Sequence, residues 1–402
     1  MNILNQLSDL KSLRRFRLSA LQLLDRPIVR SGQKIDMSLL WMVALMTAFS
    51  LLMIYSASIA YAADEGGDQF AFLIRQASFV GLGLVVCSGL SFVSMNAWKR
   101  IMPWYYLLCG LLLAAVLVLG REINGATRWL HVGPVNVQPS EMFKLATVLY
   151  LSSLFTRKAE VLQSWTKILA PGFLLAVGVG LMLLQPDLGS AIVVVAIVAG
   201  MLFLAGFPLR YFGVMSGILL ACIALLIVFE PYRMARVTGF LDPWSDPLGK
   251  GYQLTHSLMA IARGEWFGVG LGASLEKRFY LPEAHTDFIF AIIGEEFGFL
   301  GMLMLVFCYG WLVLRAFSIG KQARDLDLTF SAYVANGIAI WVGIQSFFNI
   351  GVNIGLLPTK GLPLPLMSYG GSAVMVMLVS MTLLLRIDFE NRRKMRGYLV
   401  EE

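Results

Sequence analysis

Residues 37–58 read MSLLWMVALMTAFSLLMIYSAS, without one charged side chain. A helix that rises about 1.5 Å per residue needs roughly 20 mainly apolar residues to cross the hydrocarbon core of a bilayer. This run is long enough, and similar runs follow at Phe72–Ser94, Trp104–Leu119, Ser140–Phe155, Ile168–Leu184, Leu188–Phe207, Tyr211–Phe229, Phe288–Leu314, Ala332–Leu357 and Leu366–Leu385. The sequence therefore predicts an all-α fold, a polytopic integral membrane bundle of about ten transmembrane helices.

The composition excludes the other broad classes. Of the 402 residues, 58% are hydrophobic and 14% are charged, which leaves too little polar surface for a soluble domain. Cysteines stand only inside the apolar runs, without paired spacing, so neither a disulfide framework nor a zinc site is expected: Cys87, Cys109, Cys222 and Cys308. The net charge of +7 is scattered over short loops, which indicates membrane loops rather than a surface for nucleic acid.

The distribution of charge predicts the orientation. When loops are assigned alternately to the two sides, most of the 32 Lys and Arg residues fall on the side that holds both termini, and the positive-inside rule makes that side cytoplasmic. Lys11 and Arg14 to Arg17 precede no cleavage site, so no signal peptide is expected. We predict a cytoplasmic tail over 1–36, one transmembrane domain over 37–388 with a large extracytoplasmic loop at about 230–286 between spans seven and eight, and a cytoplasmic tail over 389–402.

The first candidate site is the sequence YLPEAHTDFIF at 280–290, where a polar cluster runs directly into an apolar helix. Glu283, His285 and Asp287 bring three titratable groups to the outer membrane edge. One interpretation is that Thr286 or Asp287 caps the next helix. The other is that Asp287 is catalytic, with Glu283 and His285 binding the substrate.

Glu295 and Glu296 follow inside the same apolar run. A carboxylate at that depth is costly unless it finds a partner or water. On an ideal helix Glu295 lies about 80° from Asp287 and Glu296 about 180° away. We therefore expect Glu295 rather than Glu296 to share a cavity with Asp287, Glu296 to pair within the bundle, and an interhelical anchor to be the commoner role for both.

Two further motifs start helices on the outer side. In Gln138–Lys144, Glu141 and Lys144 are three residues apart and share one helix face, so they form either a local ion pair or a ligand contact. In Gln185–Gly189, Pro and Gly make a tight turn, and Asp187 is expected to cap the following helix.

The segment LPTKGLPLPLMSYGG at 357–371 has too many Pro and Gly residues for an uninterrupted helix, although spans flank it. Irregular backbone at membrane depth is tolerated only when it is buried in protein or lines a wet cavity. Lys360 and the backbone N–H groups there suit an anionic headgroup such as a phosphate, and Ser368 joins them as a substrate-binding candidate. The alternative for Lys360 is a snorkelling side chain on an ordinary loop.

Basic residues also stand on the long outer loop, against the general charge bias. Arg233 and Arg236 share one helical face, which favours an anionic ligand, although a solvated surface explains any single one of them.

Taken together, five motifs in this order resemble the SEDS family (shape, elongation, division and sporulation): Gln138–Lys144, Gln185–Gly189, Asp242–Gln253, Pro282–Glu296 and Pro358–Gly371. The resemblance covers nearly the whole chain, from the first span to Arg386. PEAHTDFIFAIIGEE and PTKGLPLP are more similar to the division branch of the family, the FtsW type, than to the elongation branch, the RodA type.

The resemblance implies a peptidoglycan glycosyltransferase that polymerises lipid II into β-1,4 glycan strands at the division septum, on the outer face of the bacterial cytoplasmic (inner) membrane. The family's essential Asp falls on Asp287, which would be the general base, and Glu141 and Lys144 match positions of the substrate cavity. Lys360, Arg233 and Arg236 would receive the departing pyrophosphate. The resemblance also implies a divalent cation, Mg²⁺ or Mn²⁺, with no assigned ligands, no organic cofactor, and a class B penicillin-binding protein of the FtsI type as partner, alongside other divisome proteins.

Three other functions remain open at this stage. A lipid II flippase needs the same cavity, embedded charges and anion site. A RodA-like elongation polymerase would share the chemistry, and a non-enzymatic divisome scaffold would use the embedded carboxylates only for structure.

Overall fold

The structure, a computed structural model, describes residues 35–64, 68–123, 126–132, 135–158, 165–214, 238–359 and 361–400, and the single residues Gly217 and Phe229. Every predicted run except Tyr211–Phe229, most of which lies outside the described residues, coincides with a helix. The elements are α2 (Met37–Asp64), α3 (Ala71–Leu90), α4 (Met95–Leu119), β1 (Arg121–Ile123), β2 (Ala126–Val132), β3 (Val135–Val137), α5 (Pro139–Arg157), α6 (Trp165–Leu184), α7 (Leu188–Leu204), α10 (Tyr252–Gly264), α11 (Ile289–Asp325), α12 (Thr329–Asn353) and α13 (Gly371–Met395).

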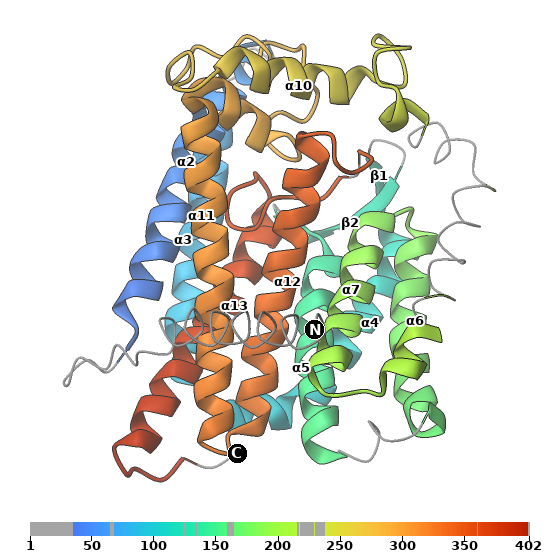
Figure 1. Ribbon diagram of the computed structural model, residues 1–402, viewed down its shortest axis with the longest axis vertical. Helices are drawn as coiled ribbons and strands as arrows, with labels where there is room; N and C mark the ends of the chain where they lie inside the picture. Colours follow the sequence, from blue (N-terminus) through green and yellow to red (C-terminus); the bar gives the residue numbers. More distant parts are fainter. Residues whose placement is uncertain are drawn as a thin grey trace, which may run out of the picture.

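The all-α membrane fold is confirmed. Within the described ranges, seven helices are long and apolar enough to span a membrane, and the shorter apolar helix α7 accompanies them. In Figure 1 the helices of this bundle run roughly side by side along its long direction. Helix α12 is the centre: 67% of its apolar window is buried, against 22% for α3, α4 and α6. It packs on α11, α5 and α7, so the peripheral helices present most of their apolar surface to lipid.

Several helix ends differ from the predicted runs. The run predicted from Trp104 starts just after Pro103, but α4 begins at Met95 and contains this proline. Helix α11 extends to Asp325 and α13 to Met395, well beyond the apolar residues, because charged side chains continue both helices at one end of the bundle. An apolar run ends where the chain leaves the lipid, whereas a helix ends where its backbone hydrogen bonds end.

A small antiparallel sheet on the connection between α4 and α5 was not predicted. Its strands have the order β1-β2-β3, with Arg121 opposite Trp129 and Leu130 opposite Val137. β1 and β3 have three residues each, too few to show a period of two, and the seven residues of β2, ATRWLHV, do not alternate strictly between apolar and polar. Arg128 on β2 donates a hydrogen bond to the carbonyl of Pro186, so the sheet is tied to the turn before α7.

Helix α10 lies across the end of the bundle (Figure 1) and packs on α11. At the contact, α11 breaks at Gly298, whose φ of 69° is left-handed. A Cβ there would lie 2.4 Å from the backbone nitrogen of Gly268, so only glycine permits this approach. The carbonyls of Glu295 and Glu296 accept from the N–H groups of Val269 and Gly270. These bonds hold the loop that precedes α11, named the outer loop after its predicted position, against the kink.

The segment between α12 and α13 returns into the bundle instead of crossing the surface. Its residues Leu362, Leu364 and Met367 are buried. Tyr309, in the middle of α11, donates to the carbonyl of Pro365 at 2.5 Å, and Ser50, in the middle of α2, donates to that of Met367 at 2.8 Å. The expectation that irregular backbone here is buried in protein is confirmed, because side chains of spanning helices satisfy its polar groups.

Candidate active site

The chain that leads into α11 turns at Glu283, which has a positive φ of 58°. Its carbonyl accepts from the N–H groups of Thr286 and Phe288, and its carboxylate accepts from the Thr286 hydroxyl at 2.6 Å. Phe288 occupies the N-cap position of α11, and its own side chain forms no capping hydrogen bond. The structure therefore differs from the expectation in position: the N-cap falls on Phe288, after both Thr286 and Asp287.

Two asparagines of α12 hold the backbone of Asp287. Asn349 and Asn353 donate to its carbonyl oxygen from their Nδ2 atoms, at 2.9 and 3.0 Å. The Oδ1 atom of Asn353 also accepts from the N–H of Ala291, at 3.1 Å. Both amides are buried, with 2% and 0% of each residue exposed. The position of Asp287 is thus set by the central helix of the bundle and not by its own loop.

The returning segment passes directly beside Asp287. Ser368 accepts from the N–H of Leu364 at 2.7 Å and donates to the carbonyl of Thr286 at 2.6 Å. A Cβ on Gly361 would lie 3.0 Å from the Oδ2 atom of Asp287, so a side chain at 361 would crowd the carboxylate. We call Asp287, Asn349, Asn353, Gly361 and Ser368 the Asp287 cluster.

Neither asparagine was predicted as a site residue, although the sequence of α12 contains a pattern that indicates them. Gln345, Asn349 and Asn353 stand four residues apart on one face of an otherwise apolar span. Amide side chains inside a span generally face the bundle interior. This spacing therefore marks the face of α12 that meets the site.

Glu141 and Lys144 form a buried ion pair on α5. Lys144 Nζ lies 2.7 Å from Glu141 Oε1 and 3.0 Å from Gln345 Oε1. Gln345 in turn donates to the carbonyl of Pro363 at 2.7 Å. The ion-pair interpretation is confirmed, and through Gln345 this pair supports the same segment that carries Gly361 and Ser368.

The turn before α7 adds a second support. Asp187 accepts from the N–H of Ser190, which confirms the predicted cap, and from the Ser140 hydroxyl at 2.9 Å. A Cβ on Gly189 would lie 3.1 Å from the carbonyl oxygen of Gly361. The motifs Gln138–Lys144 and Gln185–Gly189 thus both support the segment of backbone that carries Gly361.

The two carboxylates of α11 do not join the Asp287 cluster. Glu295 binds Arg263 Nη1 at 3.0 Å, Ser274 Oγ at 2.5 Å and the N–H of Leu275 at 2.8 Å. The expectation that it shares a cavity with Asp287 is wrong, because the outer loop supplies its partners. Glu295 is therefore a structural anchor that joins α11 to α10 through Arg263 and to the following loop through Ser274 and Leu275.

Glu296 pairs within the bundle, as expected. Lys277 Nζ lies 2.6 Å from its Oε1 atom and 2.9 Å from the hydroxyl of Ser56 on α2. All three residues are buried. Lys277, ten residues before Asp287, thus ties the outer loop to α2 through Ser56 and to α11 through Glu296.

His285 lies inside an aromatic cage. Its ring is 5.1 Å from Phe72, 5.4 Å from Tyr369 and 5.6 Å from Tyr61, measured between centroids. Burial lowers the pKa of His285 below its ordinary value, while the neighbouring Glu283 acts in the opposite direction. The imidazole is therefore neutral at neutral pH and serves the cage as an aromatic body rather than as a cation.

This pKa predicts how the stability of the protein depends on pH. Because the folded state resists protonation of His285, the unfolded state binds more protons once the pH falls through about 6.5, and stability decreases with it. We expect His285→Phe to remove that component, so that the melting temperature in detergent falls less between pH 7.5 and 5.5 than for the wild type. Equal slopes for the two proteins would contradict the assignment.

Three predicted residues, Lys360, Arg233 and Arg236, lie outside the described residues. Among the residues that the structure does describe, no group of three His, Cys, Asp or Glu side chains is placed to hold a metal ion. Mg²⁺ is commonly held by one or two carboxylates together with substrate phosphates rather than by an all-protein cage, so the divalent cation stays a prediction.

The chain is similar to known proteins over nearly its whole length. Residues 37–393 match the model of the FTSW_RODA_SPOVE family, described as cell cycle protein. A probable peptidoglycan glycosyltransferase FtsW of Neisseria gonorrhoeae is 62% identical over 94% of this chain and 90% of that protein. Another, from Aromatoleum aromaticum, is 46% identical over 91% of each. One chain of a solved peptidoglycan synthase complex that coordinates polymerization and crosslinking is 35% identical, with a TM-score of 0.72 over 89% of this chain and 98% of that one.

Proposed function

The chain belongs to the family of cell cycle proteins that includes FtsW, RodA and SpoVE, and from this premise we propose that the Asp287 cluster is its glycosyl-transfer site. The chain is a peptidoglycan glycosyltransferase of the FtsW type. The elongation-type alternative is not favoured, because the relatives that are 62% and 46% identical to this chain carry the FtsW name.

In the proposed reaction, Asp287 is the general base. The 4-hydroxyl of an acceptor sugar attacks the anomeric carbon of a lipid II donor, and the bond from that carbon to the lipid pyrophosphate breaks. Asp287 takes the hydroxyl proton, and the pyrophosphate leaves with the electron pair. A single displacement of this kind inverts an α-linked donor to a β-1,4 linkage.

The observation that carries this proposal is the clamp on the backbone of Asp287. Asn349 and Asn353 on α12 and Ser368 on the returning segment hold the backbone of residues 286 and 287. A base must be positioned to within fractions of an ångström, and packed elements provide this better than a loop. Glu283 fastens the turn and His285 fills the cage, so both support the position of Asp287, with substrate contact as their further proposed role.

Developing negative charge on the pyrophosphate needs cations nearby. Lys360, Arg233 and Arg236 are proposed for this role from the sequence. Lys360 directly precedes Gly361, whose Cα position faces the Asp287 carboxylate. Glu141 and Lys144, fully buried and paired, act in this proposal as a support for the segment that carries Gly361.

The membrane setting of the proposal is the bacterial inner membrane. We place both termini in the cytoplasm, the Asp287 cluster on the outer side and the protein at the division septum. The proposed partner is a class B penicillin-binding protein, which would crosslink the new strand. The similarity to a complex that coordinates polymerization and crosslinking supports this choice.

The deciding test is polymerisation in detergent. Purified chain with its penicillin-binding partner should convert lipid II into glycan strands, detected on a gel after labelling. A flippase would make none, because a micelle has no second leaflet. Absence of glycan under conditions where a control polymerase is active would move the assignment to transport.

The clamp itself yields a separate prediction. Asn353→Ala removes the bonds to the Asp287 carbonyl and to the Ala291 N–H, and we expect kcat to fall about ten-fold with little change in KM for lipid II, because the base moves while the binding groups stay. The matched control is Asn336→Ala, which changes the same buried residue type on α12, about 25 Å along the helix. Equal activity of the two variants would show that the clamp does not position the base.

A further inference from the structure

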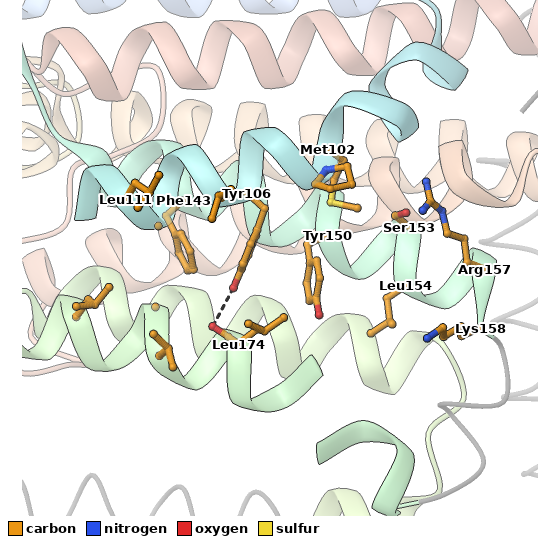
Figure 2. Close-up of a pocket in the computed structure, with 16 residues that line it drawn as sticks. Met102, Tyr106, Leu111, Phe143, Tyr150, Ser153, Leu154, Arg157, Lys158 and Leu174 are labelled. Carbon is orange, nitrogen blue, oxygen red and sulfur yellow. Dashed lines mark hydrogen bonds between the residues drawn. The ribbon is translucent and has the colours of Figure 1, made fainter. Parts of the chain in front are cut away.

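An apolar cavity lies between α4, α5 and α6, and its lining contains no residue of the Asp287 cluster. It encloses about 520 Å³ and opens toward the outside of the bundle. Figure 2 shows Tyr106, Phe143 and Tyr150 along its wall and Arg157 and Lys158 at one end. We call it the α4–α6 groove.

Small residues and close packing shape the groove. Gly178 on α6 allows the ring of Phe143 so near that a Cβ would lie 2.1 Å from it, which fixes the distance between α5 and α6 at that point. Gly110 on α4 meets nothing within 4 Å of a Cβ, so it faces the open space. The groove therefore results from the way the helices pack: α5 and α6 are in close contact at Gly178, and open space remains beside Gly110.

The walls of the groove offer hydrocarbon contacts. The hydroxyl of Tyr106 is occupied by the carbonyl of Leu174, at 3.0 Å, as Figure 2 also shows. The ring of Tyr106 stacks on that of Tyr150, with centroids 4.6 Å apart. An occupant that matches these walls is a hydrocarbon chain, since a polar molecule would lose hydrogen bonds to water without replacement.

The end of the groove carries two basic residues, and one of them is held in place by a helix irregularity. Pro103 lacks an N–H, so the carbonyl of Lys99 loses its partner within α4. Arg157 Nη2 donates to that carbonyl at 3.2 Å. Its remaining guanidinium donors and the ammonium of Lys158 are exposed at the mouth.

We infer that the α4–α6 groove binds an anionic phospholipid, with an acyl chain along Tyr106 and Tyr150 and the phosphate at Arg157 and Lys158. These residues are on the side predicted to be cytoplasmic, where anionic lipids attract basic side chains. A neighbouring groove between α5, α6 and α7 has no charged residue in its described lining, so it offers the same hydrocarbon contacts without selection by charge.

The test is lipid retention by the purified full-length chain, measured by native mass spectrometry. Wild-type protein should retain phosphatidylglycerol in preference to phosphatidylcholine supplied at equal concentration. The double variant Arg157→Gln/Lys158→Gln should lose roughly ten-fold or more of its phosphatidylglycerol binding at this site. Gly110→Leu, which fills the groove, should lose both lipids there.

Matched controls change the same chemistry elsewhere. Arg393→Gln/Lys394→Gln removes two basic residues at the end of α13, and Gly89→Leu fills open space on α3; both should bind like wild type. Equal retention of the two lipids by wild type, or an unchanged preference in Arg157→Gln/Lys158→Gln, would overturn the inference. Displacement of the lipid by inorganic phosphate alone would overturn it too, since the acyl chain would then contribute nothing to binding. If Gly110→Leu does not fold, the charge variants decide the question.

Discussion

Asp287→Asn leaves a folded, membrane-inserted protein whose glycan synthesis falls by a factor of about 10² to 10⁴, the usual contribution of a general base. The amide has nearly the shape of the carboxylate but cannot take the acceptor proton. The bonds from Asn349, Asn353 and Ser368 all go to backbone carbonyls, so the substitution leaves them intact. The N-cap position of α11 falls on Phe288, so the substitution does not change the N-cap residue of this helix.

The measurement is the initial rate of lipid II polymerisation at equal protein abundance, with melting temperature as the check on folding. Asp246→Asn, which changes an exposed carboxylate of the outer loop, is the control and should keep wild-type rates. Normal cell division supported by Asp287→Asn would leave only the scaffold function standing.

The second large effect concerns stability. Glu296→Ala should destabilise the protein by about 3–5 kcal/mol, because the Lys277 ammonium would stay buried without its carboxylate. The two side chains are 0% and 2% exposed, so solvent screens this pair little. The outer loop that leads to Asp287 would lose its tie to α2 and α11, and activity should fall together with stability.

A double replacement distinguishes a lost charge partner from lost packing. Glu296→Gln/Lys277→Met removes both charges and should recover much of the stability that Glu296→Ala loses. The exposed-site control is Lys250→Met on the outer loop, where the melting temperature in detergent should hardly change. Additive losses in the double variant would mean that the two residues do not interact.

The apolar runs predicted the bundle well because the free energy of placing a residue in lipid depends mainly on that residue and its near neighbours. The same local character explains the helix caps: Asp187 could be assigned from its turn alone. Caps fail as predictions where the start of a helix is set by other elements. Asp287 shows this, since α12 and the returning segment determine where α11 begins.

The Glu295 and Glu296 pair shows a different limit. Glu295 and Glu296 have different partners, as their positions on different faces of an ideal helix predict. The partner predicted for Glu295, a cavity shared with Asp287, is not the one it has. The outer loop folds back onto α11 at the Gly298 kink, and it brings Arg263, Ser274 and Lys277 to these carboxylates. An ideal helix drawn from the sequence contains neither the kink nor the loop.

By itself, the sequence determined the membrane class of this protein, the position of nearly every described span and the polar cluster at 283–287, because apolar length and polar motifs are properties of continuous stretches. The choice of Asp287 within that cluster came from the resemblance to the family. Only the tertiary structure decided which partner each buried polar group receives. Ser56 reaches Glu296 across 240 residues and Lys144 reaches Gln345 across 201. The cost of a buried charge is settled by the geometry of such distant partners, and no local pattern contains that geometry.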